Sequence, residues 1–242
     1  MTFSTYSLTV RHFPAQGRRS GIIASSGGNG ITINAGVTDI VNLRGLVVEG
    51  AGVGKNGIVF NTGQTLTIEK CVIRNHTNNG IQFQPNASSN LVVSDTFVAN
   101  NKGGNGIVVG PSGSGTVMAV FTRVEADNNG DGILIDSTLY VGTGLTATAT
   151  ESVAAGNTGV GFKVNSNGTG LSLMLFRSAA VNNDTGISAQ GNSATLRIGQ
   201  SMVTGNANGW TALLGGAVKS YKDNKIDGNN SNQTAPPAIS DK

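Results

Sequence analysis

The chain has 242 residues, of which 36 are glycine and only 12% are charged, and its formal net charge is +3. Alanine-rich and leucine-rich stretches are absent, which indicates a turn-rich β protein rather than a helical or disordered one. The positive excess comes from Arg11, Arg18 and Arg19, so no basic stripe predicts nucleic-acid binding. A single cysteine, Cys71, excludes an internal disulfide framework.

The start of the chain, residues 1–20, lacks the repeat that fills the remainder, and we expect it to form an N-terminal cap or a flexible arm. It has neither a lysine-led start nor an uninterrupted apolar stretch, so we expect no signal peptide in this chain. No segment approaches membrane-spanning length, and we expect no membrane span.

A glycine followed by a bulky apolar residue then returns at intervals of 23 to 29 residues. A repeat of roughly 25 residues is typical of one turn of a solenoid. After each glycine the pattern is apolar, any, apolar, which predicts a strand with one buried face. The repeated steps are Gly30-Ile31, Gly57-Ile58, Gly80-Ile81, Gly106-Ile107, Gly132-Ile133, Gly161-Phe162, Gly186-Ile187 and Gly209-Trp210.

Two more strands are expected in each repeat, as in LTIEK at 66–70 and CVIRN at 71–75. Three short strands per coil predict an all-β, single-domain, right-handed parallel β-helix of about eight to nine coils over residues 21–229. Trp210 is expected to plug the core near the last coil. The remainder, residues 230–242, reads as a disordered C-terminal tail.

Aligning the repeats on their glycines predicts columns of stacked residues. Asparagine suits an internal turn ladder because it tolerates the left-handed region, and opposite charges in neighbouring coils attract. The apolar column is Leu66, Leu91, Val117, Leu145, Leu171 and Leu196. The asparagine column is Asn101, Asn128, Asn157, Asn183, Asn206 and Asn229. The charged column is Lys70, Asp95, Thr122, Glu151, Arg177, Gln200 and Asp223.

The alternation GI-x-[apolar], a Gly/Ser/Asn turn, L-x-[apolar] and S-x-[VA]-x-x-N resembles the right-handed parallel β-helix repeat family, the pectate-lyase-like superfold, over roughly residues 30–230. The runs TIEKCVIRNHTNNGIQF, ESVAAGNTGVGF and SMVTGNANGW are similar to those of uncharacterised bacterial β-helix repeat proteins. The resemblance implies an extracellular or cell-surface location in bacteria. It leaves the chemistry open, because this fold carries lyases, hydrolases and adhesins alike.

Catalysis in that superfold implies clustered charged residues on the outward face of the first sheet. Among the outward positions after the glycines, Asp136 and Lys163 are the candidates for an acid and base pair, with a surface ion pair between adjacent coils as the alternative. Asp127 and Asp131 flank an Asn-Asn-Gly turn, but two carboxylates are too few to predict Ca²⁺. No metal or other cofactor is expected.

The leading hypothesis is therefore a non-catalytic secreted or surface protein, structural or in weak contact with polysaccharides. Its candidate contact residues are Gln82, Gln84, Asn165 and Gln190. The alternative is a minimal polysaccharide lyase or glycoside hydrolase acting on an acidic polysaccharide. An ice-binding rod is disfavoured, because a Thr-x-Thr series fills one coil only, at 146–150. End-to-end self-association through an imperfectly capped coil is a further expected interaction.

Overall fold

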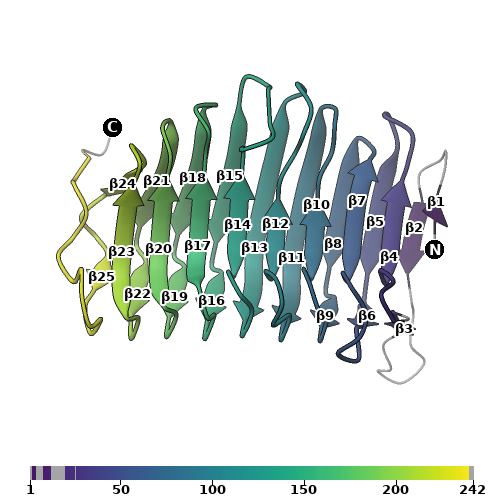
Figure 1. Ribbon diagram of the computed structural model, residues 1–242, viewed down its shortest axis with the longest axis horizontal. Helices are drawn as coiled ribbons and strands as arrows, with labels where there is room; N and C mark the ends of the chain where they lie inside the picture. The colour runs from purple at the N-terminus through teal and green to yellow at the C-terminus, as the bar shows by residue number, and fades with distance from the viewer. Residues whose placement is uncertain (1, 4–7, 12–19, 25, 240–242) are drawn as a thin grey trace.

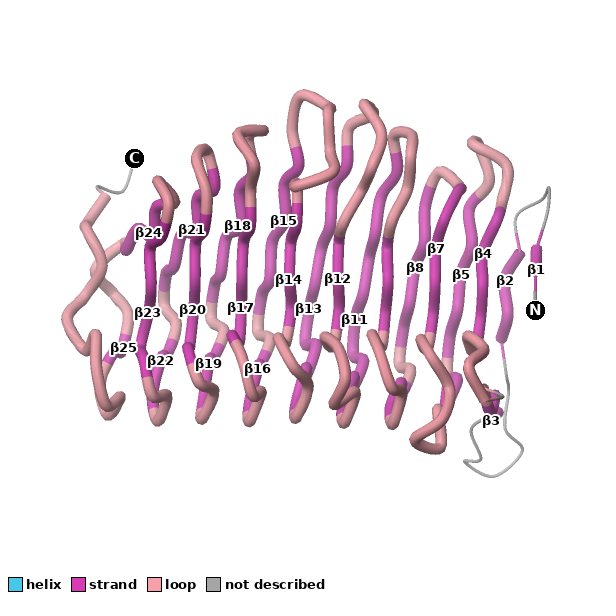
Figure 2. The backbone as a smooth tube through the Cα atoms, viewed as in Figure 1, coloured by secondary structure: helices cyan, strands magenta, loops and turns pink. Residues whose placement is uncertain are grey.

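The computed structural model describes residues 2–3, 8–11, 20–24 and 26–239. The described residues form a rod of stacked parallel β-coils and contain no helix, with the two ends of the chain at opposite ends of the rod (Figures 1 and 2). The predicted all-β, right-handed parallel β-helix is confirmed.

The first strands of the coils form a nine-stranded parallel sheet, called the first sheet below, which agrees with the predicted eight to nine coils. Its strands are β1 (Thr2–Phe3), β4 (Ile31–Asn34), β7 (Ile58–Thr62), β10 (Ile81–Phe83), β12 (Ile107–Val109), β14 (Ile133–Asp136), β17 (Val160–Asn165), β20 (Thr185–Gln190) and β23 (Asn208–Leu213). Their inward residues follow the anchor glycines, and Ile58 pairs with Ile31 and Ile81 in register.

The second and third strands of each coil form the opposite wall of the rod. The second strands are β2 (Leu8–Arg11), β5 (Ile40–Arg44), β8 (Thr65–Glu69), β11 (Ser89–Ala99), β13 (Val117–Asp127), β15 (Leu145–Thr150), β18 (Leu171–Phe176), β21 (Ala194–Gly199) and β24 (Ala217–Ser220). The third strands are β3 (Ser20–Ile23), β6 (Leu46–Glu49), β9 (Val72–Arg74), β16 (Val153–Ala155), β19 (Ala179–Val181), β22 (Met202–Thr204) and β25 (Lys225–Ile226). In β11 and β13 the second and third strands run together as one element.

The core is a stack of apolar layers between these walls. Side chains alternate between buried and partly exposed along the strands, as the period of two requires. Phe60 and Phe83 stack in neighbouring coils with ring centroids 4.7 Å apart. Because each coil covers the next, every interior layer is closed by its neighbours.

A buried ladder of side chains runs along the corner after the third strands. It passes through Asn129 and not through the expected Asn128. Asn157 Oδ1 accepts the backbone N–H of Asn129 at 2.9 Å, and the same bond repeats from coil to coil. The left-handed backbone belongs to the preceding position, where Asn128 has φ of 56°. The ladder consists of His76, Asn101, Asn129, Asn157, Asn183, Asn206 and Asn229.

Two other predicted columns are corrected by the strand register. Leu91 pairs with Ala119, two residues beyond the expected Val117, and a shift of two keeps the same face of the strand. Leu171 likewise pairs with Ala194, so Leu196 belongs to the neighbouring column, opposite Leu173. In the charged column Arg123 takes the place of Thr122, and its Nε lies 2.6 Å from Asp95 Oδ1.

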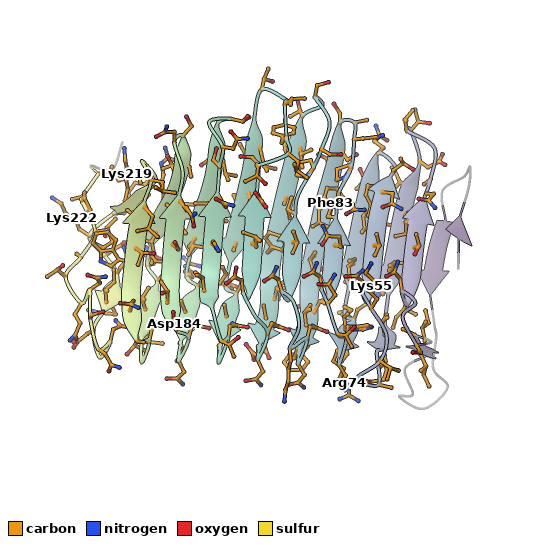
Figure 3. The ribbon with its side chains drawn as sticks, in the orientation of Figure 1. Lys55, Arg74, Phe83, Asp184, Lys219 and Lys222 are labelled. Carbon is orange, nitrogen blue, oxygen red and sulfur yellow. The ribbon has the colours of Figure 1, made fainter. Side chains whose placement is uncertain are left out.

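The described residues at the two ends of the rod contact the neighbouring coils. The described parts of residues 1–20 add strands to β4, β5 and β6, and the remainder of that segment lies outside the described residues. Residues 230–239 lie against the last coil, where Ser231 bridges to Asn208 and Ala238 bridges to Ser220. Trp210 is half-buried against the core, and its Nε1 donates to the Thr234 carbonyl at 2.7 Å. Lys219 and Lys222 mark this end in Figure 3.

Candidate functional site

A polar hollow of about 370 Å³ lies on the outward side of the first sheet, across β4, β7 and β10, and is called the amide groove below. Two of the predicted contact residues, Gln82 and Gln84, line it. The groove is lined by Asn29, Thr32, Lys55, Asn56, Val59, Asn61, Asn78, Gln82 and Gln84.

The floor of the groove is a side chain in an outward column of the first sheet. Thr32, Val59 and Gln82 occupy one outward column in three successive coils. Val59 is only 6% exposed and forms the floor. The register of β7 also shifts after Phe60, so that Asn61 is an extra residue at a β-bulge. Asn61 stands two residues after Val59 in β7, on the same face, and lines the groove.

The amide side chains at this face are hydrogen-bonded to one another across coils. Asn61 Nδ2 donates to Asn34 Oδ1 at 2.7 Å, and Gln84 Nε2 donates to Asn61 Oδ1 at 2.8 Å. Each bond joins residues one coil apart. The amides are therefore held in place before any ligand arrives, which lowers the entropy that binding must remove.

A second ladder, called the corner ladder below, runs beside the groove just before the first sheet. Asn79 Oδ1 accepts the backbone N–H of Asn105 at 2.8 Å, and Asn105 Oδ1 accepts that of Asp131 at 2.9 Å. Asn79 Nδ2 also donates to Gln82 Oε1, which connects the corner ladder to the groove. The members of the corner ladder are Asn29, Asn56, Asn79, Asn105 and Asp131.

The charge in the groove is positive. Lys55 lines it, no carboxylate does, and no ion pair to Lys55 is present among the described residues. Figure 3 shows Lys55 near the lower part of the first sheet and Arg74 farther down, at the edge of the rod. Arg74, by contrast, is paired with Glu49 at 2.8 Å. Burial alone would raise the pKa of Glu49, but hydrogen bonds from Asn75, Ala51 and Arg74 lower it overall.

Two further hollows continue along the corner. One of about 420 Å³ shares Asn78 with the amide groove, and one of about 630 Å³ is lined partly by His76 and Lys102. His76 is 3% exposed, and its Nδ1 lies 3.2 Å from Asn101 Oδ1. Its Nε2 has no hydrogen-bond partner among the described residues, and burial lowers the pKa of the ring. The buried imidazole is therefore a neutral first rung of the asparagine ladder.

The predicted acid and base candidates do not pair with each other. Lys163 lies opposite Leu134, and its Nζ is 3.4 Å from Asp131 Oδ2. Asp136 lies opposite Asn165 and accepts the backbone N–H of Thr138 at 2.9 Å. The ion pair expected between Asp136 and Lys163 is thus replaced by one between Asp131 and Lys163. Both candidates lie outside the amide groove.

The four predicted amide contacts fall into two separate groups. Asn165 and Gln190 pair in register across β17 and β20. Gln82 lies level with Val108 of β12 and Leu134 of β14, whereas Asn165 and Gln190 lie level with Asp136 of β14. Gln82 therefore belongs to a different outward column from Asn165 and Gln190. Only Gln82 and Gln84 belong to the groove.

Most groove residues were not identified from the outward positions of the strands. Two of them, Asn29 and Asn56, belong to the corner ladder, and their sequence signal is an asparagine directly before the anchor glycine, at Asn29-Gly30 and Asn56-Gly57. Asn61 follows from the alternation, because it stands two residues after the outward Val59. Lys55 lies in the loop before an anchor glycine and carries no pattern of its own.

No group of three or more His, Cys, Asp or Glu side chains is placed to hold a metal ion within the described ranges. Asp127 Oδ1 accepts the backbone N–H of Ala155 at 3.0 Å, and Asp131 Oδ1 accepts that of Val160 at 2.7 Å. Burial raises the pKa of Asp127, the Ala155 N–H lowers it, and the charge of Glu125 adds to the increase. Both carboxylates serve the turns that they flank.

The described part of the chain contains no helix with the length and apolar character that a membrane crossing needs. No protein-family model, curated protein or solved structure matches this chain.

Proposed function

We propose that this protein is a non-catalytic, secreted or surface β-helix that binds carbohydrate polymers in the amide groove. The observation that carries the proposal is the groove itself, in which Asn61, Gln82 and Gln84 come from two successive coils and are held by hydrogen bonds. The groove contains no carboxylate that would act as an acid or base.

Amide side chains suit a hydroxyl-rich ligand because they donate and accept hydrogen bonds, as sugar hydroxyls do. Coils are spaced by about 4.8 Å, so the groove offers similar groups at regular steps along the rod. The groove is open to the surface, which favours shallow contacts with an extended chain over enclosure of a small molecule. Weak binding along a polymer is the expected behaviour.

A lyase or hydrolase acting on an acidic polysaccharide is the alternative function. It would need Asp136 and Lys163 to act together, whereas Lys163 is paired with Asp131 and both lie outside the groove. We also propose that the protein comes from a bacterium and is related to the pectate-lyase-like β-helices. The stacked coils and the repeat pattern support this relationship. End-to-end association would need residues 230–239 to leave the edges of β23 and β24 at Asn208 and Ser220.

The test is affinity electrophoresis of the full chain through gels that contain single polysaccharides, both neutral and acidic. We expect retarded migration in at least one polymer, with no shortening of that polymer after long incubation. Unchanged migration in every gel, confirmed by a glycan array without signal, would contradict the proposal.

A further inference from the structure

The orientation of the Gln82 amide in the groove is fixed, through Asn79, by a backbone N–H. A backbone N–H can only donate, so the Asn79 atom that faces the N–H of Asn105 at 2.8 Å is the oxygen Oδ1. The other atom of that amide is therefore Nδ2, and it faces Gln82. Since Nδ2 donates, the Gln82 atom that it meets is Oε1. The Nε2 group of Gln82 is consequently left to face away from the corner ladder.

This arrangement is specific to one coil. The residue three positions after each member of the corner ladder lies on the outward face, and the series from Asn29 onward is Thr32, Val59, Gln82, Val108 and Leu134. Gln82 alone in this series carries an amide whose direction a ladder residue can set. Lys55 supplies an ammonium group to the same groove. The groups that these two residues offer to a ligand are therefore hydrogen-bond donors.

We infer that Asn79 is a positioning residue that turns Gln82 so that the amide groove recognises acceptor-only oxygens on a carbohydrate. This inference rests on the proposed function and adds the chemistry of the group recognised. Carboxylates and acyl carbonyls are such acceptors, whereas a plain hydroxyl both donates and accepts. At Gln82 and Lys55 an acceptor-only substituent costs less affinity than a hydroxyl, because no donor on the ligand is left facing a donor without a partner.

The variant Asn79→Asp tests this role without removing the ladder bond. An aspartate oxygen still accepts the N–H of Asn105, and its second oxygen can accept only from Gln82 Nε2, so Gln82 must turn its Oε1 outward. The fold already accepts aspartate in this ladder, since Asp131 occupies the equivalent position. The matched control is Asn105→Asp, because the residue three positions later, Val108, has no amide to turn.

Two readouts are needed. The first is the NMR signal of the Gln82 side-chain NH₂ without ligand, which should shift in Asn79→Asp and stay in place in Asn105→Asp. The second is the affinity of the wild-type chain and both variants for three probes: polygalacturonate, a neutral acetylated polysaccharide and a neutral galactan without acyl groups. We expect the wild type to bind the first two about tenfold more tightly than the third.

Asn79→Asp should lose about tenfold in affinity for the acetylated polymer, while Asn105→Asp stays within about twofold. The acetylated polymer carries no charge, so repulsion by the new carboxylate does not explain that loss. The inference is overturned if the wild type binds plain galactan as tightly as the other two probes, or if both variants change in parallel. Absence of binding to every polymer would instead overturn the proposed function and this ligand class together.

Discussion

A methyl group on Gly132 would lie 3.0 Å from Nδ2 of Asn157 and 2.5 Å from the backbone oxygen of Gly161. The same approach recurs at Gly106 with Asn129 and at Gly161 with Asn183. The recurrent glycine and the recurrent asparagine are thus two parts of one corner. The ladder amide packs where a Cβ would be, and it can do so only beside glycine.

Replacing Gly132 by alanine should therefore destabilise the fold by about 1 to 3 kcal/mol, because the new Cβ meets backbone and ladder atoms that cannot move freely. The measurement is urea unfolding followed by circular dichroism. Gly170→Ala is the control, since a Cβ there has no atom within 4 Å. Equal unfolding midpoints for the two variants would contradict the account of the repeat.

Removing an asparagine side chain of the buried ladder should lower the free energy of unfolding more than removing the side chain of the residue beside it. Asn157→Ala takes away the acceptor of Asn129 and the donor to the Ala126 carbonyl, all in a buried corner. We expect a loss of about 3 kcal/mol in the free energy of unfolding. The neighbouring Asn128→Gly should change it by less than about 0.5 kcal/mol, because Asn128 is exposed with positive φ. Similar losses in both would show that the ladder adds no stability.

His76 predicts a dependence of stability on pH. Burial lowers its pKa in the folded chain, so the unfolded chain binds the proton more readily. The free energy of unfolding is therefore highest above the pKa of His76 in the unfolded chain, about 6.5. It decreases as the pH falls from there toward the lower pKa of His76 in the folded chain. Glu49 opposes part of this shift through its charge.

The variant His76→Asn should remove that dependence and raise stability by about 1 kcal/mol at pH 5.5, because an amide supplies the second donor that the other rungs use. Thermal unfolding of both chains between pH 7.5 and pH 5.5 provides the measurement. If the unfolding temperatures of the two chains fall in parallel with pH, residues other than His76 cause the loss of stability in acid.

Catalysis by Asp136 and Lys163 has its own test. We expect no unsaturated products and no new reducing ends when the chain is incubated with pectin, alginate or glycosaminoglycans, because Lys163 is paired with Asp131. Turnover that disappears in Lys163→Met and persists in Lys225→Met, a change at an exposed lysine of the last coil, would establish the enzyme instead.

The fold was readable from the sequence because each coil repeats the same physical requirement at the same place. The predicted alignment of the coils was wrong where two identical residues are adjacent, as with Asn128 and Asn129, because the spacing of the repeat does not distinguish them. Because the loops around β11 and β13 differ in length, the predicted columns were also misaligned at Val117 and Arg123. Asn61, Gln82 and Gln84 were recognisable as outward residues, whereas the partner of Lys163 depends on where its ammonium group lies.

The central claim, that carbohydrate binds in the amide groove, is tested most directly by filling it. Val59→Phe places a large side chain on the floor without removing a polar group, and Val108→Phe does the same at a position in the same column outside the groove. In affinity gels that contain the polymer bound by the wild type, we expect Val59→Phe to migrate as if no polymer were present and Val108→Phe to be retarded like the wild type. Equal retardation of the two variants would contradict the claim.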